Sequence, residues 1–166
     1  MRRVGERRSA RAELHPAVSA APTRTGRAIG YTTGVFDMFH VGHLNVLRRA
    51  RELCDHLIVG VTTDDLCVAR KGKRPVIPFD ERSEIVAGIR FADTVVAQSS
   101  MDKMAAWTEH RFHLMFVGDD WRGSELWNRY EREFAEVGVE LVYLPYTVHT
   151  SSTLLRQRVE SEEAAS

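Results

Sequence analysis

The chain has 166 residues and a mass of 18.9 kDa, 43% of its residues are hydrophobic, and 23 lysines and arginines balance 23 aspartates and glutamates. A chain of this size can bury the core of one domain, and its balanced charge gives no indication of a nucleic-acid or membrane partner. No apolar run reaches the length of a transmembrane helix. Cys54 and Cys67 form neither a CxxC pair nor a disulfide framework, so we expect a protein of the reducing cytoplasm.

The two ends of the chain differ from its middle. Residues 1–27 contain seven arginines and two prolines without a sustained apolar period, and they lack the apolar core of a signal peptide. We predict a disordered Arg-rich extension there; a basic arm that contacts acidic partners or nucleic acid is the alternative. Residues 161–166 are predicted to fray, which leaves residues 28–160 as the folded domain.

Within the folded domain, short apolar stretches alternate with amphipathic helical ones. The predicted strands are residues 29–33, 57–62, 94–97, 114–117 and 140–144. The predicted helices are residues 43–54, 79–89, 101–110, 127–137 and 152–159. This alternation predicts a doubly wound, Rossmann-like α/β fold with a parallel five-stranded sheet and helices on both faces. In such folds ligands bind beyond the carboxyl ends of the strands, so polar segments that follow the strands are expected to meet at one edge.

The first predicted strand leads into a motif with two histidines. His40 and His43 flank Gly42 where the strand gives way to a helix. A helix start offers free backbone N–H groups and the positive end of the helix dipole, and glycine lets a ligand approach the backbone. Imidazoles donate hydrogen bonds to phosphate oxygens without a permanent charge. The motif therefore predicts a nucleoside triphosphate site, in preference to an ordinary helix cap.

Basic residues follow the second strand and the next helix. Lys71, Lys73 and Arg74 are predicted to lie in a flexible loop, where a phosphate-binding role and a solvated basic turn stand about equal. Arg90 either serves the site or a subunit interface, or simply ends a helix beside the capping residue Asp93.

Polar segments also follow the fourth and fifth strands. Asp119 and Asp120 could accept hydrogen bonds from ribose hydroxyls, hold Mg²⁺, or cap a turn, and Trp121 could face a base or an acceptor, or pack internally. Residues 150–153 place four hydroxyl groups before the last helix, and ordinary N-capping accounts for only one of them.

These segments together resemble a known family. Residues 34–43, GVFDMFHVGH, resemble the GTFDxxHxGH signature of the small nucleotidyltransferases, and most closely the glycerol-3-phosphate cytidylyltransferases. Residues 90–96 resemble that family's RYVDEVI, residues 118–121 match its GDDW, and residues 147–155 occupy the place of its RTxGISTTxI. The resemblance extends from Tyr31 to Arg158.

The resemblance implies a homodimeric transferase that moves CMP from CTP to a small phosphorylated alcohol, by default glycerol 3-phosphate, and releases pyrophosphate. Mg²⁺ is implied as a cofactor that enters with the triphosphate, without a resident metal ligand from the protein. The implied catalytic residues are His40, His43, Lys71 and Lys73, although a one-residue insertion could shift the lysine pair toward Arg70 or Arg74. The implied nucleotide-binding residues are Gly34, Val35, Phe36, Gly42, Asp119, Ser151, Ser152 and Thr153. The implied substrate-binding residues are Asp37, Arg90, Asp120, Trp121, Tyr146 and Thr147, with Asp37 expected to act by fixing the histidine loop.

The chain departs from the family pattern at two places. Val35 replaces the usual threonine, which removes one hydroxyl contact. Tyr146 replaces the arginine of RTxG, and a phenol cannot supply a planar bidentate phosphate clamp. His149, Arg156 and Arg122 are the candidates to compensate, and the loss bears on the acceptor more than on the reaction.

Two other functions remain open on the sequence. One is an adenylyltransferase that uses ATP and a sugar phosphate or similar acceptor with the same residues. The other is a non-catalytic nucleotide-binding module whose Arg-rich arm recruits a partner. The intact pair His40 and His43 and the pair Lys71 and Lys73 argue against the second.

Overall fold

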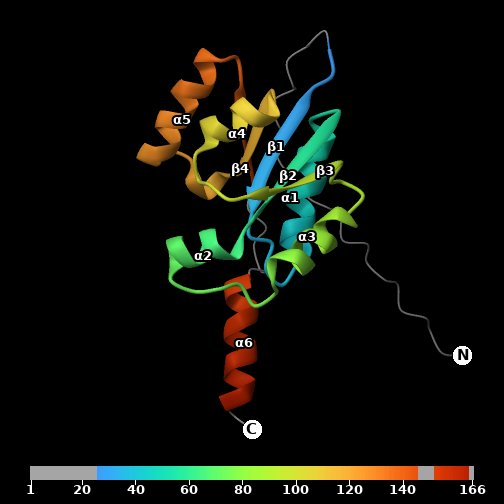
Figure 1. Ribbon diagram of the computed structural model, residues 1–166, viewed down its shortest axis with the longest axis vertical. Helices are drawn as coiled ribbons and strands as arrows, with labels where there is room; N and C mark the ends of the chain where they lie inside the picture. The colour runs from blue at the N-terminus through green and yellow to red at the C-terminus, as the bar shows by residue number, and fades with distance from the viewer. Residues whose placement is uncertain (1–25, 146–151, 165–166) are drawn as a thin grey trace, which may run out of the picture.

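A computed structural model describes residues 26–145 and 152–164 of the chain (Figure 1). Its five strands form one sheet in the order β3-β2-β1-β4-β5, and every neighbouring pair is parallel. The strands are β1 (Ile29–Gly34), β2 (His56–Thr62), β3 (Thr94–Gln98), β4 (Leu114–Gly118) and β5 (Glu140–Leu144). The predicted doubly wound parallel sheet is therefore confirmed.

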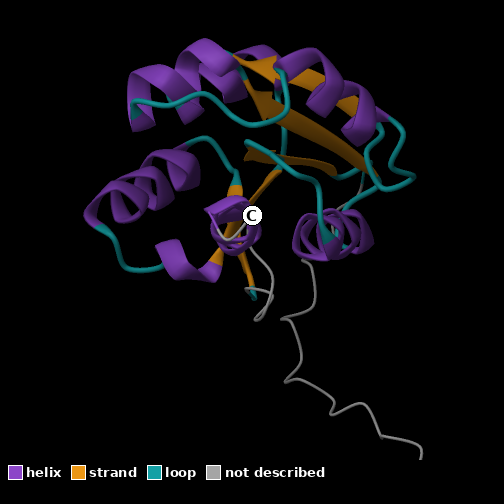
Figure 2. Ribbon diagram, turned by 90° about the horizontal axis from the view of Figure 1, so that it is seen from below, coloured by secondary structure: helices purple, strands orange, loops and turns teal. Residues whose placement is uncertain are grey.

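Helices cover both faces of this sheet (Figures 1 and 2). One core cluster joins α1 and α3 to the sheet through Leu47, Ala50 and Val86, and the other joins α4 and α5 to the opposite face around Trp127 and Phe134. The helices are α1 (Val41–Glu52), α2 (Asp64–Lys71), α3 (Phe79–Ala87), α4 (Lys103–His110), α5 (Glu125–Glu136) and α6 (Ser152–Ala164), with a short 3-10 helix, η1 (Asp119–Trp121).

The strand order reverses between β1 and β4, at the centre of the sheet. In a doubly wound sheet this switch point leaves a crevice outside the carboxyl ends of the strands. The histidine motif follows β1, α2 follows β2, and η1 follows β4, so all three lie at that edge. Figure 1 shows α2 and the start of α6 below the same edge, from which α6 projects away from the sheet.

Helix α2 was not predicted. The prediction of a flexible basic loop after β2 is wrong for its first residue, Lys71. Thr63 caps α2 by accepting a hydrogen bond from the Leu66 amide. Gly72 ends the helix in the left-handed region, at φ 69°, which suits glycine. Lys71 is therefore the last helical residue and not part of a loop. The N-cap signature Thr63-Asp64-Asp65 was the available signal in the sequence.

Other helix boundaries follow the caps. Helix α4 begins at Lys103 because Asp102 accepts hydrogen bonds from the amides of Met104 and Ala105. Helix α6 continues to Ala164, beyond its predicted end at residue 159 and into the segment expected to fray.

A buried arginine fastens the loops at the carboxyl edge to one another. Arg82 in α3 is 1% exposed. Its guanidinium donates hydrogen bonds to the carbonyl oxygens of Ile77 (2.8 Å) and Val35 and to Asp64 Oδ1 (2.6 Å). One side chain thus joins the histidine loop, the start of α2 and the segment before α3.

We predict that Arg82→Met lowers the free energy of unfolding by about 3–5 kcal/mol, because it leaves the carboxylate of Asp64 without its buried partner. Urea unfolding measures this. The control is Arg129→Met, which removes an exposed i,i+4 pair with Glu133 and is expected to change stability by less than about 1 kcal/mol. Equal losses in the two variants would contradict this role for Arg82.

Candidate active site

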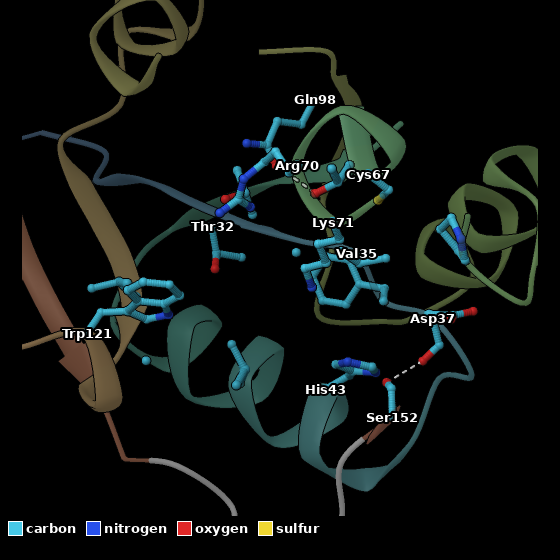
Figure 3. A pocket seen from close by; sticks show the side chains of 18 of the residues that line it. Thr32, Val35, Asp37, His43, Cys67, Arg70, Lys71, Gln98, Trp121 and Ser152 are labelled. Carbon is cyan, nitrogen blue, oxygen red and sulfur yellow. Dashed lines mark hydrogen bonds between the residues drawn. The ribbon is translucent and has the colours of Figure 1, made fainter. Parts of the chain in front are cut away.

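A cavity of about 830 Å³ opens at the carboxyl edge of the sheet (Figure 3). It gathers residues that lie far apart in the sequence, from the ends of β1 and β4, the starts of α1 and α6, and the segment after β2. The predicted site residues that line it are Gly34, Val35, Phe36, Asp37, His40, Gly42, His43, Lys71, Lys73, Asp120, Trp121, Ser152 and Thr153. Tyr146, Thr147 and Ser151 lie outside the described residues, as does His149.

Two predicted site residues do not line the cavity. Asp119 begins η1, whose other residues do reach the cavity. Arg90 precedes the amino end of β3 and therefore lies at the opposite edge of the parallel sheet, exposed and stacked 4.7 Å from the ring centroid of Phe91. Arg90 thus lies away from the cavity of this chain, and its substrate-binding role stays a prediction. The alternative, in which Arg90 ends a helix beside a capping Asp93, is wrong. Helix α3 ends at Ala87, and Asp93 accepts a hydrogen bond from the Leu57 amide of β2 and pairs with Arg51.

His40 is both a helix cap and a wall of the cavity. Its Nδ1 accepts a hydrogen bond of 3.0 Å from the Gly42 amide at the start of α1. Because an amide only donates, the proton of the neutral imidazole must be carried by Nε2. Burial lowers the pKa of His40 below its usual value. The cap therefore leaves His40 as a neutral Nε2–H donor.

His43 lies against His40, with 3.9 Å between ring centroids, and beside the rings of Phe36 and Phe39. Burial, and then the adjacent His40, lowers the pKa of His43 to about 4. The imidazole is therefore neutral at pH 7. Its Nδ1 is buried and has no hydrogen-bond partner among the described residues. A buried polar atom of this kind costs free energy unless a ligand or water satisfies it.

The loop that presents the histidines has an unfavourable backbone that side chains hold in place. Phe36 and Met38 have φ of 55° and 46°, in the left-handed region. Between them, Asp37 is 4% exposed and accepts hydrogen bonds from the amides of Val76 (3.0 Å) and Ile77 (2.9 Å).

Helix α6 completes the fastening of that loop. Arg156 pairs with Asp37 Oδ2 at 2.8 Å, and Ser152 Oγ donates a 2.7 Å hydrogen bond to the Asp37 carbonyl oxygen (Figure 3). Burial alone would raise the pKa of Asp37, but the amides of Ile77 and Val76 and the Arg156 guanidinium outweigh it and hold that pKa below its usual value. The Asp37 carboxylate thus fixes the conformation of the loop that presents the histidines.

The charges on the cavity wall are strongly unequal. The cationic side chains are Arg70, Lys71, Lys73, Arg74, Lys103 and Arg156, and the carboxylates are Asp37 and Asp120. An excess of positive charge in a cleft attracts an anionic ligand. Sequence reasoning missed Lys103 and Gln98 altogether, because residues at helix starts and strand ends are usually solvated.

No cluster of three or more His, Cys, Asp or Glu side chains able to hold a metal ion occurs within residues 26–145 and 152–164. Among the helices described, none is long and apolar enough to cross a membrane.

Known proteins resemble the chain over most or part of its length. The family described as cytidylyltransferase-like matches residues 31–158. The glycerol-3-phosphate cytidylyltransferase of Bacillus subtilis is 31% identical over 129 residues, which cover 77% of this chain and 94% of that protein. The FAD synthase of Pyrococcus abyssi is 48% identical over 63 residues, covering 38% of this chain and 43% of that protein. A lipopolysaccharide core biosynthesis protein from Thermoplasma volcanium shares the fold, with a TM-score of 0.63, 22% identity, and coverage of 75% of this chain and all of that one.

We predict that His40→Asn keeps stability near that of the wild type but lowers turnover about 10²–10³-fold, because asparagine caps a helix yet lacks the Nε2–H donor. His40→Ala should lose the same turnover and, in addition, about 1 kcal/mol of stability. Thermal unfolding and pyrophosphate release measure the two effects. Wild-type turnover in His40→Asn would show that His40 acts only as a helix cap.

The low pKa of His43 predicts a loss of stability in acid. Below about pH 6.5 the unfolded chain takes up a proton that native His43 refuses until about pH 4. The free energy of unfolding should therefore fall as the pH falls through this window, with a slope of up to about 1.4 kcal/mol per pH unit. Urea unfolding at pH 7, 6 and 5 should show a shallower decline for His43→Gln. Parallel declines would contradict a neutral, buried His43.

Proposed function

The chain belongs to the cytidylyltransferase-like family of nucleotidyltransferases, and on that premise we propose that it transfers CMP from CTP to a small phosphomonoester, with glycerol 3-phosphate as the first candidate. The products would be a CDP-alcohol and pyrophosphate.

The observation that carries this proposal is the pair of neutral imidazoles at the start of α1, inside a cavity with an excess of cations. Transfer at a phosphorus atom needs mainly positioning and stabilisation of charge on oxygen. A fixed Nε2–H on His40 and the positive end of a 12-residue helix supply both without a covalent nucleophile.

The step we propose is an in-line displacement. A phosphate oxygen of the acceptor forms a bond to the α-phosphorus of CTP, and the bond from that phosphorus to the oxygen bridging the β-phosphate breaks. Its electron pair leaves with pyrophosphate. In this step His40 and His43 would contact the reacting phosphate, and Lys71 and Lys73 would neutralise the polyphosphate; all four residues line the cavity, which supports these roles.

The nucleoside end is assigned to η1. Asp120 can accept hydrogen bonds from ribose hydroxyls, and Trp121 presents an aromatic face to the cavity while 45% exposed. Trp127 also lines the cavity, but it is buried in the core. An exposed tryptophan at a cavity mouth is suited to contact a base or an acceptor.

The choice of CTP follows the Bacillus relative, which aligns over nearly its whole length. The local match to an FAD synthase favours one alternative, an adenylyltransferase that uses ATP with the same residues. A few hydrogen bonds to the base edge would decide between these nucleotides.

We further propose that Mg²⁺ enters bound to the triphosphate, because that ion is commonly held by substrate phosphates with few protein ligands. The two free cysteines are buried, which suits a reducing cytoplasm. A homodimer remains a proposal from the family resemblance.

The test is pyrophosphate release with Mg²⁺, with CTP or ATP offered against glycerol 3-phosphate, phosphoethanolamine and sugar phosphates. We expect turnover with CTP and a phosphorylated alcohol, and its loss by at least about 10²-fold in a folded His43→Ala variant. Turnover with ATP alone would replace the cytidylyl assignment with the adenylyl one. Nucleotide binding without turnover on any acceptor would favour a non-catalytic module.

A further inference from the structure

One wall of the cavity is apolar and has no role in the proposed transfer. Met101, Leu126, Trp127 and Tyr130 all line the cavity, and none of these four side chains carries a charge. Met101 follows β3, and the other three lie in the first two turns of α5. We call these four residues the apolar wall. Its composition indicates what kind of group a ligand places against it.

The apolar wall is continuous across two elements of the fold. The rings of Trp127 and Tyr130 lie 5.5 Å apart between centroids. The Tyr130 hydroxyl donates a 3.2 Å hydrogen bond to the carbonyl oxygen of Met101. This bond joins α5 to the segment after β3. It also uses the one proton that the phenol can donate, so that proton is not available to a ligand.

Leu126 stands apart from the core that the rest of α5 forms. The apolar period of this helix buries Trp127, Tyr130 and Phe134 against the sheet. Leu126 lies outside that period and is 44% exposed, yet it lines the cavity. Exposed apolar surface in a concave site is typically covered by a ligand. The leucine therefore suits contact with an apolar group better than it suits the packing of α5.

The chemistry of the apolar wall decides which substrate it can hold. A nucleobase carries several donors and acceptors on its edge, and the hydroxyls of glycerol 3-phosphate need hydrogen-bond partners as well. Burying such groups against apolar side chains costs free energy, whereas an apolar group gains by leaving water. Asp120 and Trp121, which we assign to the nucleoside, come from η1. The apolar wall is therefore left for the acceptor.

We propose that the acceptor is a phosphomonoester with an apolar, ring-bearing body, which binds against the apolar wall while its phosphate lies at the histidines. This inference rests on the proposed function and names an acceptor class in place of the default, glycerol 3-phosphate. One molecule can reach both places because the apolar wall and the histidines line the same cavity of about 830 Å³. Aromatic rings suit a surface of tryptophan, tyrosine and methionine, with which they form ring–ring and sulfur–ring contacts.

Three acceptors with the same three-carbon chain test this class: glycerol 3-phosphate, propyl phosphate and 3-phenylpropyl phosphate. Pyrophosphate release is measured with Mg²⁺ and with CTP or ATP, whichever supports turnover. We expect kcat/KM to rise along the series and to be at least about 10-fold higher for 3-phenylpropyl phosphate than for glycerol 3-phosphate, because even one methylene in an apolar pocket changes it by about 10–200-fold. Equal or falling values along the series would overturn the proposal.

Leu126→Gln and Met101→Gln each place a polar group in the apolar wall. Each should lower the ratio of kcat/KM for 3-phenylpropyl phosphate to that for glycerol 3-phosphate by at least about 5-fold. The control is Ile85→Gln in α3, since Ile85 is also 44% exposed but lies outside the lining of the cavity. This control should keep the wild-type ratio. An unchanged ratio in Leu126→Gln and Met101→Gln would contradict the proposal, as would a larger rise in the KM for the nucleotide than for the acceptor.

Binding without turnover separates this inference from the proposed reaction. Trp121 and Trp127 both line the cavity, so 3-phenylpropyl phosphate should change the tryptophan fluorescence of the wild type in a saturable way. We expect its Kd to rise in Leu126→Gln and to keep the wild-type value in Ile85→Gln. Saturable binding of this kind in a protein without turnover would refute the transfer reaction while keeping the apolar site. Turnover with glycerol 3-phosphate that exceeds turnover with 3-phenylpropyl phosphate would keep the reaction and refute the apolar site.

Discussion

The buried carboxylate of Asp37 is the contact on which the rest of the site depends. It joins the loop after β1 to the amides of Val76 and Ile77 and to Arg156 of α6, segments 39 to 119 residues away. Backbone in the left-handed region costs of order 1–3 kcal/mol at each such residue unless the surroundings enforce it. The hydrogen bonds of Asp37, together with those of Arg82, hold the loop in that conformation and so determine where both histidines lie.

The cavity wall combines neutral histidines with positively charged side chains. The burial that keeps His43 uncharged also excludes water, and hydrogen bonds to a ligand gain strength in such surroundings. Of the cations that face the same space, Arg156 pairs with Asp37, whereas Lys103 has no ion-pair partner among the described residues. The free protein therefore carries a cost at Lys103 and an orphaned nitrogen at His43, both of which a phosphorylated ligand can relieve.

Much of the fold could be predicted because parallel strands buried on both faces read as apolar runs, as residues 114–117 do, and because amphipathic helices show their period locally. The strand ends then place the polar motifs at one edge. Arg90 precedes a strand, so the same rule places it at the opposite edge.

The sequence by itself determined the order along the chain of the five strands and of every helix except α2 and η1, together with the histidine motif and the family, because these depend on local periodicity and on residues adjacent in the chain. Only the tertiary structure decided which charges are buried and what they contact. Arg82 meets Val35 across 47 positions, and Lys103 meets Thr33 across 70. In the local sequence, a lysine or arginine that becomes buried cannot be distinguished from one that stays solvated. Its burial is decided by the packing of the helix against the sheet, which no short stretch of sequence records.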